Sequence, residues 1–261
     1  MNRSGASWSR RSVAEGRAES ARAFHVKTNV LEVLGDRYAL NSGQLAQLEA
    51  ILHELRRDRR APTTVRDAQQ AADVHLADSL VALELEVVRK ARTIADLGSG
   101  AGFPGAALAV ALPAAEVSLI ESQGRKCGFL EGMLAEVGVE NANVVCVRVE
   151  EWHDGIRCND VVVTRAVAAQ AVVLEYAAPV LRLGGTLVDW RGRRTPADED
   201  AALAGAEELG LERVEVRRVQ PWPRAKDRHL HVFVKVEETS GRFPRRPGIA
   251  RKRPLGGRGA R

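Results

Sequence analysis

After residue 92 the chain alternates between short apolar runs, often β-branched, and longer amphipathic stretches. The apolar runs predict strands, whereas the stretches between them have the spacing of helices. Helices are expected at 104–112, 124–137, 167–182 and 197–209. Strands are expected at 93–97, 116–121, 143–149, 160–165, 185–190, 213–219 and 230–236.

Strands separated by helices of this length imply right-handed crossovers and a parallel sheet covered on both faces. The last two strands differ, because the loop QPWPRAKDRH between them has no helical pattern. They should therefore pair antiparallel. The predicted fold class is α/β, with a mostly parallel seven-stranded sheet that ends in an antiparallel hairpin. This is the outline of the Rossmann-like class I S-adenosylmethionine-dependent methyltransferase fold.

The part of the chain before residue 93 predicts a helical extension to this fold. Leucines recur at steps of three and four after a cap at Asn41, and a second helix should run from Asp67 to about Lys90. Residues 1–40 show little periodicity and are expected to be loosely ordered. The expected organisation is an extension (1–40), packed N-terminal helices (41–92), a core (93–240) and a basic flexible tail (241–261).

Charge is distributed unevenly along the 261 residues. The formal net charge is +5, but residues 241–261 hold eight Lys or Arg and no acid, so the other 240 residues sum to −3. A basic, Gly- and Pro-rich segment of this kind is typical of an arm that contacts a polyanion, although it could be merely solubilising. We expect its deletion to weaken binding of the polyanion and to leave cofactor affinity nearly intact.

Other compositional signals narrow the class of protein. The longest apolar stretch, 161–181, contains Arg165, Gln170 and Glu175, and therefore does not suit a membrane span. Arginines near the start are not followed by an apolar run, so we expect a cytoplasmic protein. The three cysteines, 127, 146 and 158, have no metal-like spacing, and we expect buried thiols and no bound metal.

The stretch IADLGSGAGFPG at 94–105 carries the first candidate site. Ligands of such sheets bind at the carboxyl ends of the strands, and glycine lets a ligand approach the main chain. Gly98 and Gly100 follow the first strand directly, but Phe103 stands where a dinucleotide fingerprint needs its third glycine. This spacing weakens the pyrophosphate interpretation.

Acids near the glycines favour a different ligand. Asp96 precedes the loop and could accept hydrogen bonds from an ammonium group or from loop N–H groups. Glu121 ends the second strand, 23 residues after Gly98, where a carboxylate accepts ribose hydroxyls. The combination favours S-adenosylmethionine over NAD.

Three further positions at the same edge complete the predicted site. Val149 and Glu150 follow the third strand and are placed to contact an adenine, although Glu150 could simply begin a solvated loop. Arg165 closes the fourth strand, where it should be partly buried and need an anionic or aromatic partner; a helix-capping or surface arginine is the alternative. His75 and Asp78 share a helix face and could brace the glycine loop or only pack the helix.

Several motifs together resemble one known family. DLGSGAGFPG at 96–105, HLADSL at 75–80, VEE at 149–151, RAVA at 165–168 and the end FPRRPGIARKRPL are similar to the bacterial 16S rRNA guanine-N7 methyltransferases, also called glucose-inhibited division protein B. The resemblance covers about residues 41–255. It implies Gly98, Phe103, Val149, Glu150 and Arg165 as cofactor-site positions, and 16S rRNA or the small ribosomal subunit as partner.

The resemblance also implies a chemistry. Guanine N7 has an in-plane lone pair, so no general base is expected, and Arg165 would bind and orient. The RNA phosphates should meet the tail and four arginines, at 57, 59, 60 and 66. We expect a monomer. The alternatives are an NAD-dependent oxidoreductase and a catalytically silent RNA-binding assembly protein.

Overall fold

The computed structural model describes residues 30–65 and 67–256, and its centre is one seven-stranded sheet. The strand order is β3-β2-β1-β4-β5-β7-β6, with β1 to β5 parallel and β7 antiparallel to both of its neighbours. The predicted mostly parallel sheet with a terminal hairpin is therefore confirmed. The strands are β1 (Thr93–Leu97), β2 (Glu116–Ile120), β3 (Ala142–Val145), β4 (Asn159–Arg165), β5 (Leu181–Arg191), β6 (Leu211–Arg218) and β7 (His229–Lys235).

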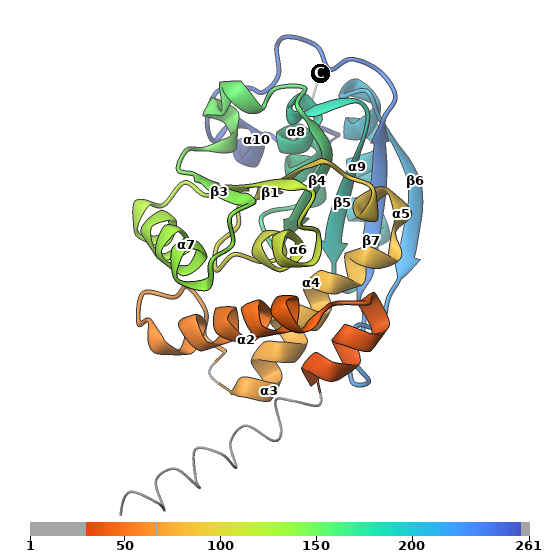
Figure 1. The fold of residues 1–261 in the computed structure, drawn as a ribbon. Coiled ribbons are helices and arrows are strands. Elements are labelled where there is room, and N and C mark those ends of the chain that lie inside the picture. Colours follow the sequence, from red (N-terminus) through yellow and green to blue (C-terminus); the bar gives the residue numbers. More distant parts are fainter. Residues whose placement is uncertain (1–29, 66, 257–261) are drawn as a thin grey trace, which may run out of the picture.

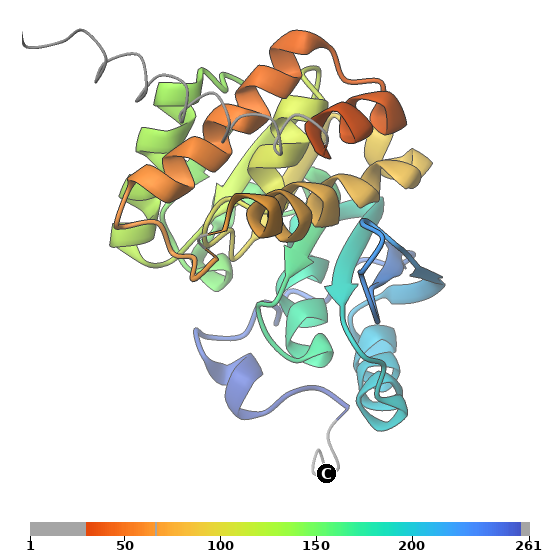
Figure 2. The same cartoon turned by 90° about the horizontal axis from the view of Figure 1, so that it is seen from below.

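Helices cover both faces of the sheet and give the molecule three layers (Figures 1 and 2). One outer layer holds the N-terminal helices together with α6 and α7, and the opposite layer holds α8, α9 and α10. The core helices are α6 (Gly105–Ala111), α7 (Gly124–Val137), α8 (Gln170–Val180), α9 (Pro196–Glu208) and α10 (Ile249–Lys252), with short 3-10 turns at η3 (Val149–Glu151) and η4 (His153–Gly155).

The alternation along each strand explains the two cores. Ile94 faces the N-terminal layer whereas its neighbour Ala95 faces α8 and α9, and the three buried valines of β4, 161 to 163, alternate in the same way. Successive side chains of a strand point to opposite faces, so a strand buried on both sides is apolar throughout. This is why the buried strands appear as continuous apolar runs in the sequence.

The N-terminal helices differ in part from the expectation. Helix α2 (Ser42–Arg57) begins at the predicted cap, where Asn41 and Gln44 exchange side-chain to main-chain hydrogen bonds. The second helical run also begins at its predicted cap, Asp67, but it changes pitch along its length and breaks at Leu85. Its segments are α3 (Ala68–Ala71), the π-helical η1 (Ala72–Ala77), α4 (Asp78–Leu80), the 3-10 turn η2 (Val81–Glu84) and α5 (Glu86–Arg89).

Two expectations about the ends of the chain need correction. Residues 30–38, expected to be loosely ordered, form a helix with Leu31 and Leu34 buried, and the rest of the 1–40 extension lies outside the described residues. Residues 241–256, expected to be a flexible tail, pack on the core through Phe243, Ala250 and Leu255. These apolar residues stand among arginines, a lysine and prolines, so the composition of the segment did not indicate that it packs on the core.

The cysteines also depart from the expected buried thiols. Cys127 and Cys146 form a disulfide with their Cα atoms 5.8 Å apart, and Cys158 is an exposed thiol. The first turn of α7 lies beside the segment that follows β3, and this tertiary neighbourhood cannot be derived from a spacing of 19 residues. No helix in the described residues is long and apolar enough to cross a membrane.

Candidate cofactor site

A pocket opens at the carboxyl ends of four neighbouring strands, as expected for a ligand site of a parallel sheet. Each strand contributes the residues that follow it, because parallel strands all end at the same edge. Helix α8 adds Tyr176 and the C-terminal segment adds Arg251. The strand-end segments in the lining are Leu97 and Gly98 at the end of β1, residues 120–123 and Lys126 at and beyond the end of β2, residues 147–150 after β3, and Ala166 and Val167 after β4.

Gly98 brings two of these segments into contact. Its φ is +73°, and a Cβ there would lie 2.7 Å from Cγ2 of Val167. Its N–H donates to the carbonyl of Ile120 at 2.8 Å, which fixes the loop against the end of β2. A side chain at this position would therefore be strained by the backbone and would push away the segment that follows β4.

Asp96 supports the glycine loop from inside the fold. Its Oδ2 accepts from the N–H of Gly105 at 2.9 Å, so the carboxylate holds the first residue of α6. Burial raises the pKa of Asp96 to about 6, against the opposing effects of the Gly105 N–H and the positive charge of Arg165. Its Oδ1 is buried without a hydrogen-bond partner in the structure. This leaves an acceptor for a donor group of a ligand.

Glu121 ties the loops after β1 and β2 together. Its Oε1 accepts from the N–H groups of Ser122 and Gln123 at 2.8 and 2.9 Å, and its Oε2 accepts from Gly100 N–H at 3.2 Å. Lys126 Nζ lies 3.7 Å from Oε2. A carboxylate has about four acceptor positions, so three backbone donors fix its orientation and still leave capacity for a ligand hydroxyl.

Val149 and Glu150 form the wall that follows β3, inside the short turn η3. The expected strand to residue 149 ends earlier, at Val145, and the chain then bends over the pocket. Glu150 Oε1 accepts from the N–H of Gly248 at 3.0 Å. Glu150 is therefore joined to the C-terminal segment, and the alternative of a freely solvated loop residue is wrong.

Phe103 and Arg165 lie behind the pocket and not in its lining. Arg165 Nη1 donates to Asp78 Oδ2 at 2.8 Å and to the carbonyl of Val74 at 3.1 Å. Its guanidinium carbon is 6.0 Å from the centre of the Phe103 ring. Arg165 thus has both the anionic and the aromatic partner that its burial requires: Asp78 connects it to the N-terminal helices, and Phe103 connects it to the glycine loop.

His75 supplies the other contact with Phe103. The two rings stack with centroids 4.8 Å apart and planes inclined by 14°. Burial, together with the positive charge of Arg165, lowers the pKa of His75 to about 4, so the imidazole is neutral near pH 7. Of the two interpretations of this helix face, the contacts match a brace: His75 stacks on Phe103 of the glycine loop, whereas Asp78 acts through Arg165.

Four of the seven predicted site residues therefore line the pocket: Gly98, Glu121, Val149 and Glu150. Gly100 reaches it through Glu121, and the two remaining residues form the layer behind it. Sequence reasoning missed Tyr176, Lys126, Arg148 and Arg251. Of these, only Arg251 lay in a motif that the sequence had singled out, the FPRRPGIARKRPL segment, and that segment was expected to contact RNA.

The chemical inventory of the pocket is short. Its lining contains two carboxylates, three basic side chains and one phenol, and no His, Cys or Asp among the described residues. Within residues 30–65 and 67–256 there is no group of three side chains that could hold a metal ion. The arrangement suits a ligand with hydroxyl and ammonium donors held against the main chain of the glycine loop.

The fold and this strand-edge pocket define the class of S-adenosylmethionine-dependent methyltransferases. Among solved structures, the S-adenosylmethionine-dependent methyltransferase SibL is similar with a TM-score of 0.53 and 15% identity over 84% of this chain and 77% of that chain. A predicted O-methyltransferase of Agrobacterium tumefaciens is similar with a TM-score of 0.50 and 25% identity over 63% of this chain and 81% of that chain.

Sequence relatives identify the family within this class. The family model described as rRNA small subunit methyltransferase G matches residues 43–230. A ribosomal RNA small subunit methyltransferase G of Rubrobacter xylanophilus is 38% identical over 95% of this chain and 98% of its own length. One of Chloroflexus aggregans is 35% identical over 83% of this chain and 92% of its own length. The chain belongs to the rRNA small subunit methyltransferase G family, and the resemblance seen in the sequence is confirmed.

Proposed function

We propose that this protein transfers a methyl group from S-adenosylmethionine to N7 of a guanine in 16S rRNA. Family membership supports methyl transfer over hydride transfer, and the pocket at the ends of β1 to β4 supports a nucleoside-bearing cofactor. The observation that carries the proposal is Glu121, which three backbone N–H groups orient at the position where a ribose-binding carboxylate is needed.

The residues present fit this cofactor. Gly98 leaves main chain free for close approach, Glu121 would accept ribose hydroxyls, and Val149 with Glu150 would contact the adenine. The unpartnered Oδ1 of Asp96 offers an acceptor beside the glycine loop, which suits the ammonium group of an amino acid. When bound, S-adenosylmethionine supplies a sulfonium-activated methyl group that a neutral ring nitrogen can accept without first losing a proton.

The chain's own residues are consistent with a reaction of this type. A guanine N7 acceptor needs alignment with the methyl group and an electrostatic environment that stabilises the positive charge moving onto the purine. It does not need a general base. The imidazole of His75 is held neutral and stacked, so it braces Phe103 and does not relay protons. Arg165 is engaged with Asp78 and therefore acts as a positioning residue for the glycine loop.

The direct test uses small ribosomal particles that lack the modification. Purified protein and methyl-labelled S-adenosylmethionine should place label in 16S rRNA, and strand cleavage chemistry selective for 7-methylguanine should map it to one position. Free 16S rRNA in a parallel reaction shows whether the assembled particle is required. A wild-type protein that binds RNA but transfers no methyl group would instead support the assembly-protein alternative.

The RNA surface and the assembly state belong to the same proposal. Arg57 and Arg60 form ion pairs with Glu54 and Asp58, whereas Arg59 is exposed; Arg66 lies outside the described residues. We expect a cytoplasmic protein. We also expect a monomer, because within residues 30–65 and 67–256 the exposed large apolar side chains come from separate segments of the chain. They are Val33, Val87, Ile156, Leu183, Val214 and Val236.

A further inference from the structure

The C-terminal segment, residues 241–256, is part of the folded core. Phe243, Ala250 and Leu255 are buried in the same apolar cluster as α8 and α9. Figures 1 and 2 show α10 beside α8, on the side of the sheet away from the N-terminal helices. The segment is therefore held next to the ends of β3 and β4, where the pocket lies.

A buried ion pair anchors this segment. Glu175 on α8 is 1% exposed, and its carboxylate receives both Nε and Nη2 of Arg245, the former at 2.7 Å. The same Arg245 Nη2 also donates to the carbonyl of Arg253 at 2.8 Å. A forked guanidinium on a buried carboxylate fixes both partners in orientation, so the chain between residues 245 and 253 is held as a loop over α8.

The anchored loop contacts two walls of the pocket. The N–H of Gly248 donates to Glu150 Oε1, in the segment after β3, and Arg251 Nη2 donates to the carbonyl of Val167, in the segment after β4, at 3.1 Å. Burial raises the pKa of Tyr176, Glu150 adds to the rise, and a hydrogen bond to Arg251 opposes it. The guanidinium of Arg251 thus belongs to the lining of the pocket, beside Tyr176 and Glu150.

We propose that Arg251 is a cofactor-binding residue, and that residues 241–256 form the wall at the adenosine end of the pocket. This inference rests on the proposed function, which places adenine at Val149 and Glu150. A guanidinium has five N–H donors, so it retains donors for adenine ring nitrogens after its contacts with Val167 and Tyr176. The basic C-terminal segment then serves the methyl donor and is not only an arm for RNA.

Calorimetric titration of the full chain with S-adenosylhomocysteine tests the proposal. Arg251→Ala should weaken binding about tenfold or more, since a hydrogen bond to a charged group contributes about that factor. Arg251 is an exposed residue, so the substitution should leave the melting temperature nearly unchanged. Lys252→Ala is the matched control, because it removes one charge from the same turn of α10 at a side chain outside the pocket lining, and it should bind as the wild type does.

A second ligand separates the two ends of the cofactor. 5′-Methylthioadenosine keeps the adenosine and lacks the amino-acid carboxylate, so Arg251→Ala should weaken it by the same factor. Undiminished binding of this ligand would overturn the adenosine-end assignment, and equal binding of S-adenosylhomocysteine by wild type and variant would overturn the role of Arg251 altogether. If the wild type itself binds no S-adenosylhomocysteine, the proposed function fails instead.

Discussion

At the edge of the sheet, Gly98 occupies a position that suits only glycine. Its positive φ and the 2.7 Å separation from Val167 Cγ2 leave no place for a Cβ. We expect Gly98→Ala to cost about 1–3 kcal/mol of unfolding free energy through backbone strain. It should also reduce S-adenosylhomocysteine affinity at least tenfold, because the segment after β4 must move.

Gly128→Ala provides the comparison for this prediction. Gly128 lies within α7, and a Cβ there meets nothing within 4 Å. Alanine should stabilise the helix by about 0.5–1 kcal/mol and leave ligand binding unchanged. Urea unfolding and calorimetry on both variants measure the two effects, and equal behaviour of the two variants would contradict the close approach at Gly98.

His75 gives a prediction about pH. Its pKa is lowered from 6.5 to about 4, so between these two pH values the imidazole is protonated in the unfolded chain and neutral in the folded chain. The contribution of His75 to stability is complete above pH 6.5 and is lost as pH falls towards 4. His75→Phe keeps a ring against Phe103 and removes the titration, so its unfolding free energy should fall less steeply than that of the wild type between pH 6.5 and 4.5.

The slope is the quantity to compare in that experiment. One group titrating only in the unfolded chain changes the unfolding free energy by up to about 1.4 kcal/mol per pH unit. Urea denaturation at several pH values measures it for both proteins, whatever the absolute stability of His75→Phe. Parallel plots of unfolding free energy against pH would show that His75 takes up its proton in the folded chain over the same pH interval as in the unfolded chain.

Single residues were predictable from sequence where a strand end fixes their place. Gly98 and Glu121 each follow a strand directly, and Val149 and Glu150 lie in the short segment after β3, so locating the strands located them. Arg251 was not predictable in this way, because its partners Val167 and Tyr176 are brought to it by tertiary packing.

At the scale of elements, Asp78 joins the N-terminal helices to the sheet. Its carboxylate contacts Arg165 at the end of β4 and lies 3.3 Å from Nε of Arg228, in the loop before β7. Its main-chain carbonyl accepts from the indole N–H of Trp190, on β5, at 2.7 Å. One residue of α4 therefore contacts three segments of the core.

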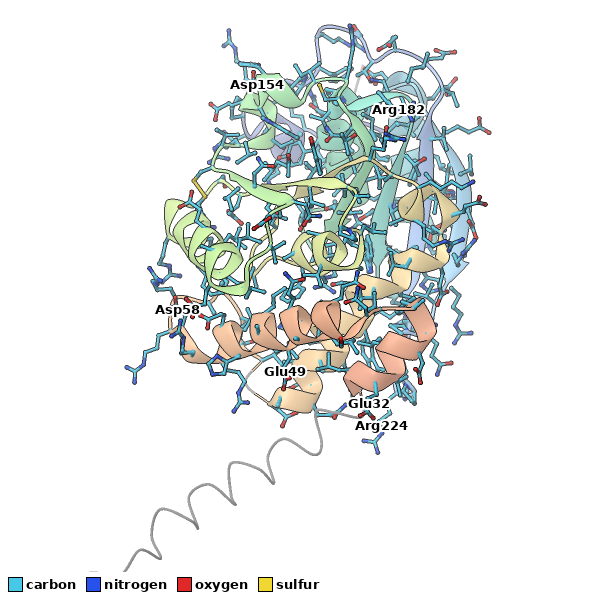
Figure 3. All side chains as sticks on the ribbon, viewed as in Figure 1. Glu32, Glu49, Asp58, Asp154, Arg182 and Arg224 are labelled. Atoms are coloured by element: carbon cyan, nitrogen blue, oxygen red, sulfur yellow. A yellow bond between two sulfur atoms is a disulfide. The ribbon has the colours of Figure 1, made fainter. Side chains whose placement is uncertain are left out.

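Removing this carboxylate should destabilise the contact between the N-terminal helices and the sheet. Asp78→Asn leaves the half-buried Arg165 without its anion, and loss of one partner from a buried pair costs about 3–5 kcal/mol. Asp58→Asn removes an equivalent charge from an exposed pair with Arg60 at the outer end of α2 (Figure 3), where we expect about 0–1 kcal/mol. Urea unfolding measures the unfolding free energy of both variants. Similar decreases in the two variants would contradict the role of Asp78 in connecting the N-terminal helices to the sheet.

The elements themselves were largely predictable. All seven strands and helices α6 to α9 lie where the apolar periodicity predicts them. For the central strands β1 and β4 the reason is burial on both faces, which imposes continuous apolar runs. The exceptions have local causes: β3 ends at Val145 since the chain turns over the pocket, and the long helical run breaks at Leu85, where the backbone is extended. The helix at 30–38 was missed because its two buried leucines alone give no clear period.

For the whole molecule, part of the excess positive charge of residues 241–261 is neutralised by ion pairs with α8 and α9. Arg245 and Arg242 pair with Glu175 and Glu208, and Arg251 lines the pocket. The expectation that deletion of this segment spares cofactor binding is therefore replaced by the opposite one.

Truncation after Ser240 should lower both stability and affinity. It leaves Glu175 buried without a partner, which costs about 3–5 kcal/mol, and it exposes the surface that Phe243 and Leu255 cover. Truncation after Gly256 retains these contacts and is the control. Thermal melts with and without S-adenosylhomocysteine measure the effect; a ligand-induced shift that survives the longer deletion would contradict it.

The contact of Gly248 with Glu150 has a consequence for biosynthesis. Ribosomes synthesise a chain from its amino end towards its carboxyl end. The segment that contains Gly248 therefore leaves the exit tunnel after every other part of the pocket except Arg251, which follows it in the same segment. A nascent chain stalled before that point could form its sheet but would lack the last wall. Methyl-donor capture then becomes a late step in maturation, and incomplete translation products would be poor competitors for the donor.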